Sequence, residues 1–527
     1  MKKIKNSASK MLCISSYVVL SSYFFVPSVS AQKIESAFKP KVLTGVGYGL
    51  EAGAFVSSAN SNPFWLRSNQ FGEVPLESQV FTLRASAHKD FDTQIRNNKN
   101  KKKLRYAYGA RAVINVGKAN QFLFSELYGK LRYGAFEFQV GRQREIIGLV
   151  DTSLSIGSYA WSGNALPMPK IQISMPNYTP ILKNGLIAVK GNFAHGWFGS
   201  GDSTEHYFLH QKSIYLRLGK PAWRFKLYGG INHQVQWGGK PRVPFLQGGT
   251  NAFITQYGSG LDAFIYVATG IPLQSLGYYR GTNTVSGEGG NRLGNHLGTI
   301  DLAVEYDNNK TKWMLYRQSI YEDGSLFVLS NISDGLTGLS IDMKGNKQGV
   351  QKIVFEYLNT TNQGGPKQSG NQTASIPELR GADDYFNNAT YEEGWTYRKQ
   401  TIGTPFLMPL SASTGVGLSD FIGNFKPREL VNPDLIINNR VRVGALSMQS
   451  QIKKVVLLTR VSYSENLGKY YLGTRELLVP VSINQVSFQQ QFTFPYKQYQ
   501  VGASLAYDSQ GILENNWGLN LLLKRKF

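Results

Sequence analysis

The sequence predicts an all-β protein: a single large antiparallel β-barrel that crosses a membrane. Three observations lead to this fold class. Apolar and polar side chains alternate with a period of two residues from near Thr44 to the C terminus. The composition, with 29 Tyr, 29 Phe, 55 Gly and only 17 % charged residues, suits short strands with aromatic belts and glycine turns. The N terminus has the features of an export signal.

Residues 1–31 are predicted to be a cleavable signal peptide. Four lysines and no acid precede a largely apolar stretch, and Val29-Ser30-Ala31 fits a small-residue cleavage site. Residues 32–527 are then the mature chain, and we expect them to form one outer-membrane barrel domain in a Gram-negative bacterium. Because the only cysteine, Cys13, lies in the leader, the mature chain has neither a disulfide nor a cysteine-based metal site.

The mature chain is predicted to cross the membrane with strands. After the leader, no run reaches the roughly 18 apolar residues that a membrane-spanning helix requires. With about 9 to 11 residues per strand plus turns and loops, a chain of this length supplies on the order of 16 to 20 strands. A barrel of that width encloses a lumen.

Residues 300–318 are predicted to form one hairpin of the barrel. Ile300, Leu302 and Val304 share one face, Asp301 points to the other, and the turn-like sequence DNNK then reverses the chain. The same alternation recurs at 223–231, 454–463 and 500–507. A soluble β-sandwich alternates in the same way, because each strand packs one face on a core. The leader, the lack of thiols and the aromatic residues at the ends of apolar faces favour the barrel.

The last predicted strand ends the chain at Phe527. Its outer face carries apolar residues between two aromatic ones, as a lipid-facing strand requires: Trp517, Leu519, Leu521, Leu523 and Phe527. Lys524 and Lys526 point to the lumen or to the interface. Arg525 shares the outer face but lies near its end, where a lipid-facing arginine costs about 0 to 1 kcal/mol. We predict that Phe527 acts as a membrane-insertion signal.

The charge and the polar segments suggest the surroundings of the barrel. The formal net charge of +23 favours acidic partners such as phosphorylated lipid headgroups or uronic-acid glycans, although a basic exported protein without such a partner has the same charge. Polar segments at 281–298 and 359–394 are predicted to be loops, and the basic run at 97–103 a solvated hairpin tip. Outer-membrane lipids and the barrel-assembly machinery are expected partners, and no nucleic acid is.

Three stretches carry less generic motifs. They contain Asn62-Pro63-Phe64-Trp65 with Ser68-Asn69; Gly141-Arg142-Gln143 with Asn164-Ala165 and Pro167-Met168-Pro169; and Tyr316-Arg317-Gln318 with Glu322-Asp323-Gly324 and Asp334-Gly335-Leu336. In order and spacing these motifs resemble the Wzi-type outer-membrane capsule-assembly proteins, particularly the branch in the Bacteroidetes. The resemblance covers nearly the whole mature chain.

The resemblance implies an eighteen-stranded barrel with helical segments that obstruct it. It also implies a non-enzymatic lectin that holds capsular polysaccharide on the cell surface. Two alternatives stay open: an outer-membrane diffusion channel for anionic or sugar solutes and, less favoured, a barrel lipid hydrolase. No cofactor is expected.

Glycan chemistry selects three candidate sets of side chains. Sugars offer hydroxyls to planar hydrogen-bonding groups and C–H faces to aromatic rings, and acidic sugars also attract cations. The sets are Trp65, Arg67 and Asn69; Arg142, Arg144, Trp161 and Asn164; and Tyr316, Arg317, Glu322 and Asp323. The alternative for each tryptophan is a membrane belt or a loop anchor, and for each arginine an ion pair in the lumen.

Enzymatic motifs are weaker, so no catalytic residue and no metal site is predicted. His206 and His210 have the spacing of two metal ligands on a helix, but the surrounding glycines and strand patterns indicate a loop. Ser203 with either histidine would be the nucleophile of the hydrolase alternative. The acid pairs Asp383-Asp384 and Glu392-Glu393 lie in a polar loop, where they are more suited to bind water or cations than to cleave a glycoside.

Overall fold

A computed structural model gives the fold of the chain from Gly45 onward. It describes residues 45–91, 103–246, 253–272, 292–322, 326, 329–345, 347–365, 383–415, 432–470 and 482–527. The predicted signal peptide, the tip at 97–102 and Asp323 lie outside these residues. Residues 45–527 form one compact unit.

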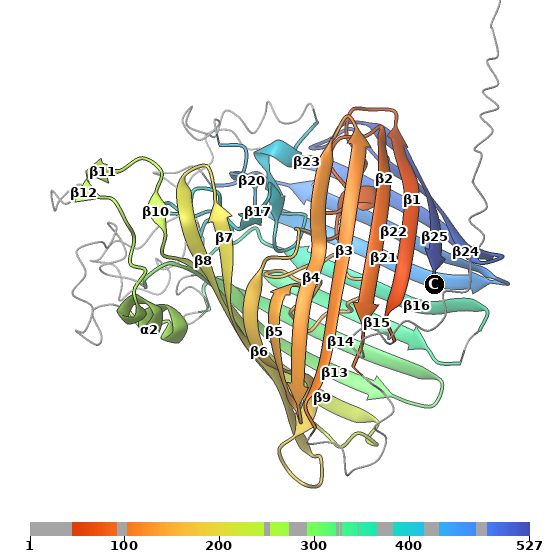
Figure 1. Ribbon diagram of the computed structural model, residues 1–527, viewed down its shortest axis with the longest axis horizontal. Helices are drawn as coiled ribbons and strands as arrows, with labels where there is room; N and C mark the ends of the chain where they lie inside the picture. Colours follow the sequence, from red (N-terminus) through yellow and green to blue (C-terminus); the bar gives the residue numbers. More distant parts are fainter. Residues whose placement is uncertain are drawn as a thin grey trace, which may run out of the picture. The chain divides into compact units, whose positions relative to one another are not determined.

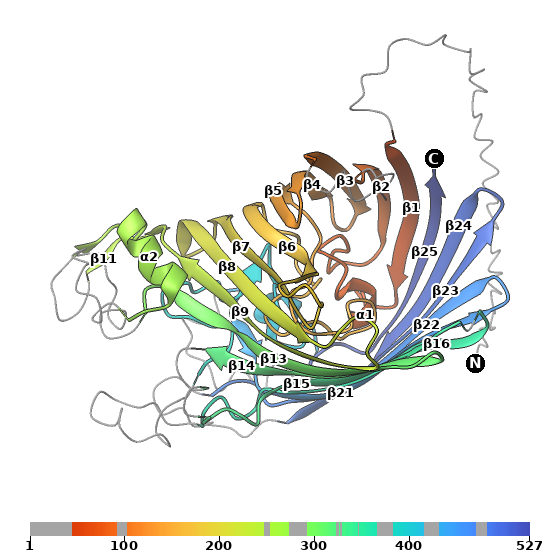
Figure 2. The same cartoon turned by 90° about the horizontal axis from the view of Figure 1, so that it is seen from below.

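The unit is a closed antiparallel barrel (Figure 1), which confirms the predicted fold class. Its eighteen wall strands among the described residues are β1 (Gly47–Ser57), β2 (Val80–Lys89), β3 (Arg105–Gly117), β4 (Gln121–Tyr133), β5 (Phe136–Arg142), β6 (Lys170–Pro180), β7 (Ile187–Ser200), β8 (Thr204–Leu218), β9 (Phe225–Trp237), β13 (Asn295–Asp307), β14 (Thr311–Glu322), β15 (Gly335–Met343), β16 (Gly349–Asn359), β21 (Val441–Ile452), β22 (Val455–Asn466), β23 (Ile483–Tyr496), β24 (Tyr499–Asp508) and β25 (Asn516–Lys526). Each strand pairs with its two neighbours, and β1 pairs with β25 to close the sheet (Figure 2).

The last strand has the predicted two faces. Leu519, Leu521 and Leu523 are 42–50 % exposed on the outside of the barrel, whereas the intervening residues 518 and 520 are buried. Lys524 points inward and donates to the Glu51 carboxylate at 2.6 Å. An apolar outer face over a polar inner one is the pattern of a barrel surrounded by lipid.

The predicted hairpin at 300–318 is also confirmed. β13 and β14 pair antiparallel from Leu297–Glu322 to Asp307–Lys312. The turn between them is fixed by the Asn308 side chain, whose Oδ1 accepts hydrogen bonds from the backbone N–H groups of Lys310 at 2.8 Å and Thr311 at 2.7 Å. A side-chain oxygen that bonds its own turn explains why an asparagine stands there.

The two ends of the barrel differ in the length of their connections. One end has short turns, at 134–135, 308–310, 453–454 and 497–498, and the chain ends there. The other end carries long connections, at 58–79, 143–169, 238–294 and 360–440. Short turns at one end and long loops at the other are typical of outer-membrane barrels, in which the long loops face outward from the cell.

Three of the long connections fold back into the barrel and fill it with a plug (Figure 2). The first, 58–79, carries α1 (Phe64–Arg67); the second is 143–169; the third, within 383–440, carries β17 (Thr396–Tyr397), β18 (Gln400–Thr401), β19 (Met408–Pro409), η7 (Leu410–Ala412) and β20 (Ile436–Asn438). Their backbone N–H groups bond to inward-facing carboxylates of the wall: Phe64 to Asp508 at 2.7 Å, Leu149 to Asp301 at 2.7 Å and Ile156 to Glu356 at 2.6 Å. Buried loop backbone is thereby satisfied by the barrel itself.

The structure adds detail to the expected loops. The obstruction of the barrel is mostly irregular chain, and α1, with four residues, is its only α-helix among the described residues. The end of the polar segment 359–394 lies inside the barrel, where Tyr385, Phe386 and Tyr391 are almost fully buried in the plug. Tyr385 and Phe386 pack against Tyr159 of the second connection, and Tyr391 packs against Tyr207 and Tyr257. The average composition of the whole segment hides these three rings.

One described helix lies on the outside of the barrel. α2 (Leu261–Thr269) follows the short strands β10 (Lys240–Pro241), β11 (Phe245–Leu246) and β12 (Phe253–Ile254), and packs on the outer face of β9 (Figure 1). Neither this nor any other helix of the described chain has the length and apolarity to span a membrane.

Candidate functional site

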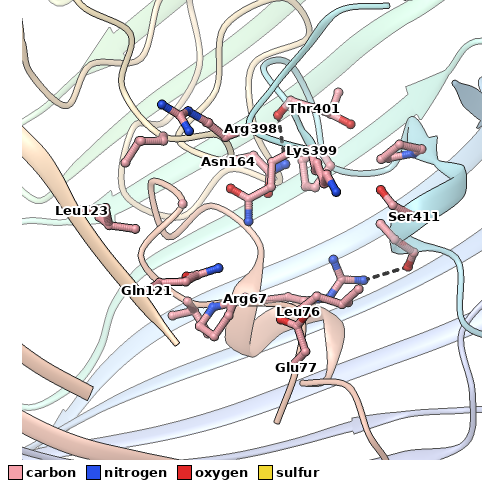
Figure 3. A pocket seen from close by; sticks show the side chains of 18 of the residues that line it. Arg67, Leu76, Glu77, Gln121, Leu123, Asn164, Arg398, Lys399, Thr401 and Ser411 are labelled. Atoms are coloured by element: carbon pink, nitrogen blue, oxygen red, sulfur yellow. Dashed lines mark hydrogen bonds between the residues drawn. The ribbon is translucent and has the colours of Figure 1, made fainter. Parts of the chain in front are cut away.

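A pocket of about 830 Å³ lies at the long-loop end of the barrel (Figure 3). Its walls come from the 58–79 connection, the start of β4, the end of β5 and the plug segment 398–412. β4 pairs with β5 only from Leu127 onward, because β5 ends at Arg142 and the chain then enters the plug. The start of β4, residues 121–126, pairs with β3 but has no partner strand on its other side among the described residues, and the pocket lies beside it.

The pocket is strongly basic. Four cations line it, and one carboxylate: Arg67, Arg142, Arg398, Lys399 and Glu77. Arg398 and Lys399 lie across the pocket from Arg67 (Figure 3). Guanidinium and ammonium groups gathered around a water-filled space attract carboxylate or phosphate groups of a ligand.

Arg398 and Lys399 are held in the pocket by a strained turn. They form the two-residue connection between β17 and β18, where Tyr397 pairs with Gln400. Both have positive φ, 54° and 64°, a combination for which Asn-Gly is the usual choice. Bulky residues in this conformation cost roughly 1–2 kcal/mol each. The turn thus holds both cations in an exposed position.

Arg67 enters the pocket from the end of α1. One of its terminal nitrogens donates to the carbonyl of Ala412 at 3.2 Å, and its Nε has no hydrogen-bond partner among the described residues. Burial lowers the pKa of Arg67, against the opposing charge of Asp508. A guanidinium that is partly desolvated and incompletely bonded gains more from an anionic ligand than a fully hydrated one.

Arg142 and Arg144 separate, although they are two residues apart. Arg142 lines the pocket and donates to the Phe124 carbonyl at 3.1 Å, at the start of β4. Arg144 turns into the barrel, forms an ion pair with Glu73 and lies 5.1 Å from the ring centre of Phe71. Arg144 therefore forms an ion pair in the lumen, which was the alternative to glycan binding for each arginine.

Asn69 and Asn164, from two different predicted sets, meet beside the pocket. The Asn164 oxygen accepts from the Asn69 backbone N–H at 3.2 Å, and its amide donates to the Thr401 carbonyl at 2.9 Å. Asn164 thus joins the first connection to the β17–β18 hairpin. Its role in the structure is to position the strained turn, with its oxygen and nitrogen both engaged.

The two tryptophans of the predicted sets are packed inside the plug. Trp65 is 1 % exposed, donates from Nε1 to Ser462 Oγ at 3.1 Å and lies under Arg460. Trp161 is 5 % exposed and packs on Trp395, with ring centres 6.3 Å apart. A stacking platform for a sugar must be open on one face. The expectation that these rings contact a glycan is therefore corrected: they anchor loops.

The described residues of the third predicted set, Tyr316, Arg317 and Glu322, do not gather into one site. Tyr316 and Glu322 point into the barrel, where Tyr316 donates to Glu356 at 2.6 Å and Glu322 accepts from Tyr159 at 2.9 Å. Arg317 shares the outer face with the lipid-facing Leu315 and holds the carbonyls of residues 332–334, one of them at 2.7 Å. The side chains of Tyr316 and Arg317 point to opposite faces because neighbouring residues alternate along a strand.

The residues of the hydrolase alternative are also separated. His206 and His210 lie in β8, where a loop was expected, and His210 faces outward against the rings of Phe193 and Phe264. Ser203 donates instead to Glu393, at 2.8 Å. No group of three or more metal-binding side chains occurs in the described part of the chain.

One member of each acid pair, Glu393 and Asp384, fixes loops to one another. Glu393 accepts from the backbone of Ser203 at 2.5 Å and of Thr204 at 3.1 Å, and so ties the β7–β8 turn to the plug. Asp384 accepts from Asn387 at 3.0 Å and Asn439 at 2.6 Å. The plug has little regular secondary structure. Its segments are held instead by hydrogen bonds from backbone N–H groups and side-chain amides to these carboxylates.

Comparisons with known proteins agree with this architecture. The structure is similar to that of Wzi from Escherichia coli, described as an outer membrane protein involved in group 1 capsule assembly and a carbohydrate-binding β-barrel; the two share 12 % identity, the match covers 90 % of this chain and 83 % of that one, and the TM-score is 0.53. OpdL of Pseudomonas aeruginosa matches 92 % of this chain and 98 % of its own at 8 % identity and a TM-score of 0.43.

The sequence gives the family. Comparison with the curated proteins found no match. The family model of the capsule assembly protein Wzi matches residues 67–407, more than half of the chain, and includes Arg67, Arg142, Arg398 and Lys399 of the basic pocket. With its eighteen-stranded barrel, this chain belongs to the Wzi capsule assembly family.

Proposed function

We propose that this protein is a non-enzymatic outer-membrane lectin that holds an acidic capsular or other surface polysaccharide at the cell surface. The observation that carries the proposal is the basic pocket at the long-loop end, with four cations and one carboxylate around about 830 Å³. Residues 1–31 are then removed on export, and Phe527 contributes to insertion. With the long loops outside the cell, the pocket faces the capsule.

The proposed contacts are Arg67, Arg142, Arg398 and Lys399. Carboxylates of uronic acids would bind to these cations, while Gln121 and Gln400 supply amides for sugar hydroxyls. The E. coli relative is described as carbohydrate-binding, which agrees with this class of ligand.

A diffusion channel is the second candidate, and the plug argues against it. A wide channel needs an open lumen, whereas Trp65, Tyr159, Trp395 and Phe406 belong to one buried cluster inside this barrel. A conductance measurement in planar bilayers separates the two functions. Large steady conductance of the wild-type protein would support the channel.

The pocket can be tested by removing the charges of the strained turn. Arg398→Gln with Lys399→Gln should reduce the cell-bound fraction of surface polysaccharide in a complemented deletion strain and weaken binding of purified protein to polygalacturonate. We expect about a tenfold loss of affinity for each cation at low salt, because a charge-assisted hydrogen bond contributes about 1.5 kcal/mol or more.

The matched control is Lys240→Gln with Arg242→Gln. These two cations lie at the same end of the barrel, with side chains about half exposed and paired to Glu205, but outside the pocket. A heat-dependent shift in gel mobility verifies that each variant forms a barrel. Equal binding by wild type and the Arg398/Lys399 variant, or equal losses in test and control, would contradict the assignment.

A further inference from the structure

A second site lies on the outer face of the barrel, beneath α2. Ala263, Tyr266 and Val267 of this helix are buried against Val235 and Trp237 of β9. The opposite side of the same helix exposes Leu261 and Ile265, by 77 % and 51 %. A helix that is apolar on the wall side and on the outer side is suited to lie in lipid at the membrane interface.

A pocket of about 480 Å³ opens between the C-terminal end of α2 and the wall. Its apolar part is made by outward-facing side chains of four neighbouring strands, each 40–51 % exposed: Phe193, Ile214, Ile231 and Ile300. Below the pocket, toward the short-turn end, Leu216, Leu227 and Leu302 continue this stripe along the same strands. The apolar wall of the pocket is thus continuous with the lipid-facing surface of the barrel.

The other end of the pocket is basic. Lys212 of β8 donates to the carbonyl of Ala268, and Arg292 donates from Nε to the carbonyl of Gly270 at 2.8 Å. Both side chains therefore sit at the C-terminal end of α2, where cations are favoured. Lys212 has three donors, so it can bond an anion in addition, and the positive charge of Arg292 attracts the same anion. Both cations lie on the long-loop side of the apolar stripe.

Two histidines complete the basic end. His296 Nε2 lies 2.8 Å from the Leu293 carbonyl, so this nitrogen carries a proton and donates. In the neutral ring Nδ1 is then an acceptor, and His233 Nε2 donates to it at 2.9 Å. This leaves His233 Nδ1 as an acceptor without a hydrogen-bond partner among the described residues, on a side chain that lines the pocket and is only 8 % exposed.

We propose that this pocket binds a phosphorylated lipid of the surrounding membrane. Its phosphate would lie between Lys212 and Arg292, a headgroup hydroxyl would donate to His233 Nδ1, and an acyl chain would follow Ile231 and Ile300 along the wall. A soluble anion such as inorganic phosphate would contact only Lys212 and Arg292. Two cations, an acceptor without a partner among the described residues and an apolar wall that faces lipid lie side by side. A molecule with a charged headgroup and an apolar chain can bind all three.

Native mass spectrometry can test the site on the full barrel. Protein is extracted from nanodiscs of phosphatidylcholine that contain lipid A, and the retained lipid A is counted before and after Lys212→Gln with Arg292→Gln. We expect the double variant to lose at least tenfold in retained lipid A. The matched control, Arg525→Gln with Lys526→Gln, removes two cations from the C-terminal end of β25, at the short-turn end of the barrel, and should retain the wild-type amount.

A second variant keeps the charges and blocks the apolar wall. Ile231→Trp fills the space below the cations, so it should also reduce lipid A retention while leaving any binding of inorganic phosphate unchanged. If the double variant fails the heat-mobility test for a folded barrel, this variant decides the question.

Three outcomes would overturn the proposal. Undiminished retention of lipid A in the Lys212/Arg292 variant would mean that these cations only cap α2. The variant would then differ from the wild type only in faster hydrogen exchange of α2. Equal loss in the β25 control would indicate unspecific attraction of an anionic lipid. Displacement of lipid A by millimolar inorganic phosphate, with no effect of Ile231→Trp, would indicate an anion site that needs no acyl chain.

Discussion

Two sectors of one barrel wall follow the same alternation but differ in what their outward-facing side chains meet. In the sector around β25, Trp517, Leu519 and Leu521 are about half exposed and face lipid. In the sector around β9, the equivalent outward positions Val235 and Trp237 are at most 4 % exposed, because α2 covers them. The covered sector also holds four of the six histidines of the chain on its outer face: His195, His210, His233 and His296. Polar rings occur on a lipid-facing wall where a helix shields them.

The largest expected difference between the sectors comes from their tryptophans. Trp237 packs on Phe208 and Phe264, with ring centres 5.2 and 5.5 Å away, so Trp237→Ala should lower the free energy of unfolding by about 3–5 kcal/mol. Trp517→Ala, at a half-exposed position, should lower it by about 1 kcal/mol. Urea unfolding in the same micelles measures the free energy of unfolding of both variants. Equal losses would show that α2 does not bury the wall.

A charge placed in the bare sector should have the next largest effect. Leu521→Arg introduces a guanidinium at the middle of the lipid-facing stripe of β25, where we expect a loss of about 2–4 kcal/mol. The natural cation of the covered sector, Lys212, is stabilised by the carbonyl of Ala268 at the end of α2. The fraction of heat-modifiable barrel in the membrane measures the effect, with Leu521→Ala as the size control. Normal assembly of Leu521→Arg would place β25 away from lipid.

The smallest predicted effect concerns the attachment of the covered sector to the plug. Burial, with the charges of Asp202 and Glu393, raises the pKa of Asp434 to about 6. The folded state then holds this proton more tightly than the unfolded chain, so stability falls as pH rises from about 4 to 6, by at most about 3 kcal/mol. Hydrogen exchange of 432–440 should be slower at pH 5 than at pH 7 after correction for the intrinsic rate.

Asp434→Asn provides the control for that pH effect, because it cannot titrate. In this variant the protection of 432–440 should be the same at both pH values, while the β21–β22 turn at 453–454 should not change in either protein. A pH dependence that persists in the variant would assign the effect to another group.

The sequence predicts the wall better than it predicts the plug. Alternation in a strand depends on what surrounds it, lipid outside and polar atoms inside, so the faces of β13, β14 and β25 follow from the residues. The outward Val235 and Trp237 satisfy the same pattern whether lipid or α2 covers them. Alternation therefore identifies the outer face correctly but does not reveal the helix that lies on it.

The site was predictable only in part, because tertiary contacts decide which polar side chains are free. Arg67 and Arg142 line the basic pocket as predicted sugar-binding residues could. Trp65 and Trp161, predicted because aromatic rings stack on sugars, are instead buried by packing in the plug. The sequence does not predict the turn at Arg398 and Lys399. A turn with positive φ is normally recognised by its Asn or Gly residues, and here an arginine and a lysine occupy these positions.

Closure of the barrel joins the two ends of the chain. Glu51 of the first strand meets Lys524 of the last, and β1 pairs with β25. The connection that follows β1 reaches the last strands from inside, since the Phe64 N–H donates to Asp508 of β24 and α1 packs on β23 and β24. The beginning and the end of the chain are therefore held together twice, once in the wall and once in the plug.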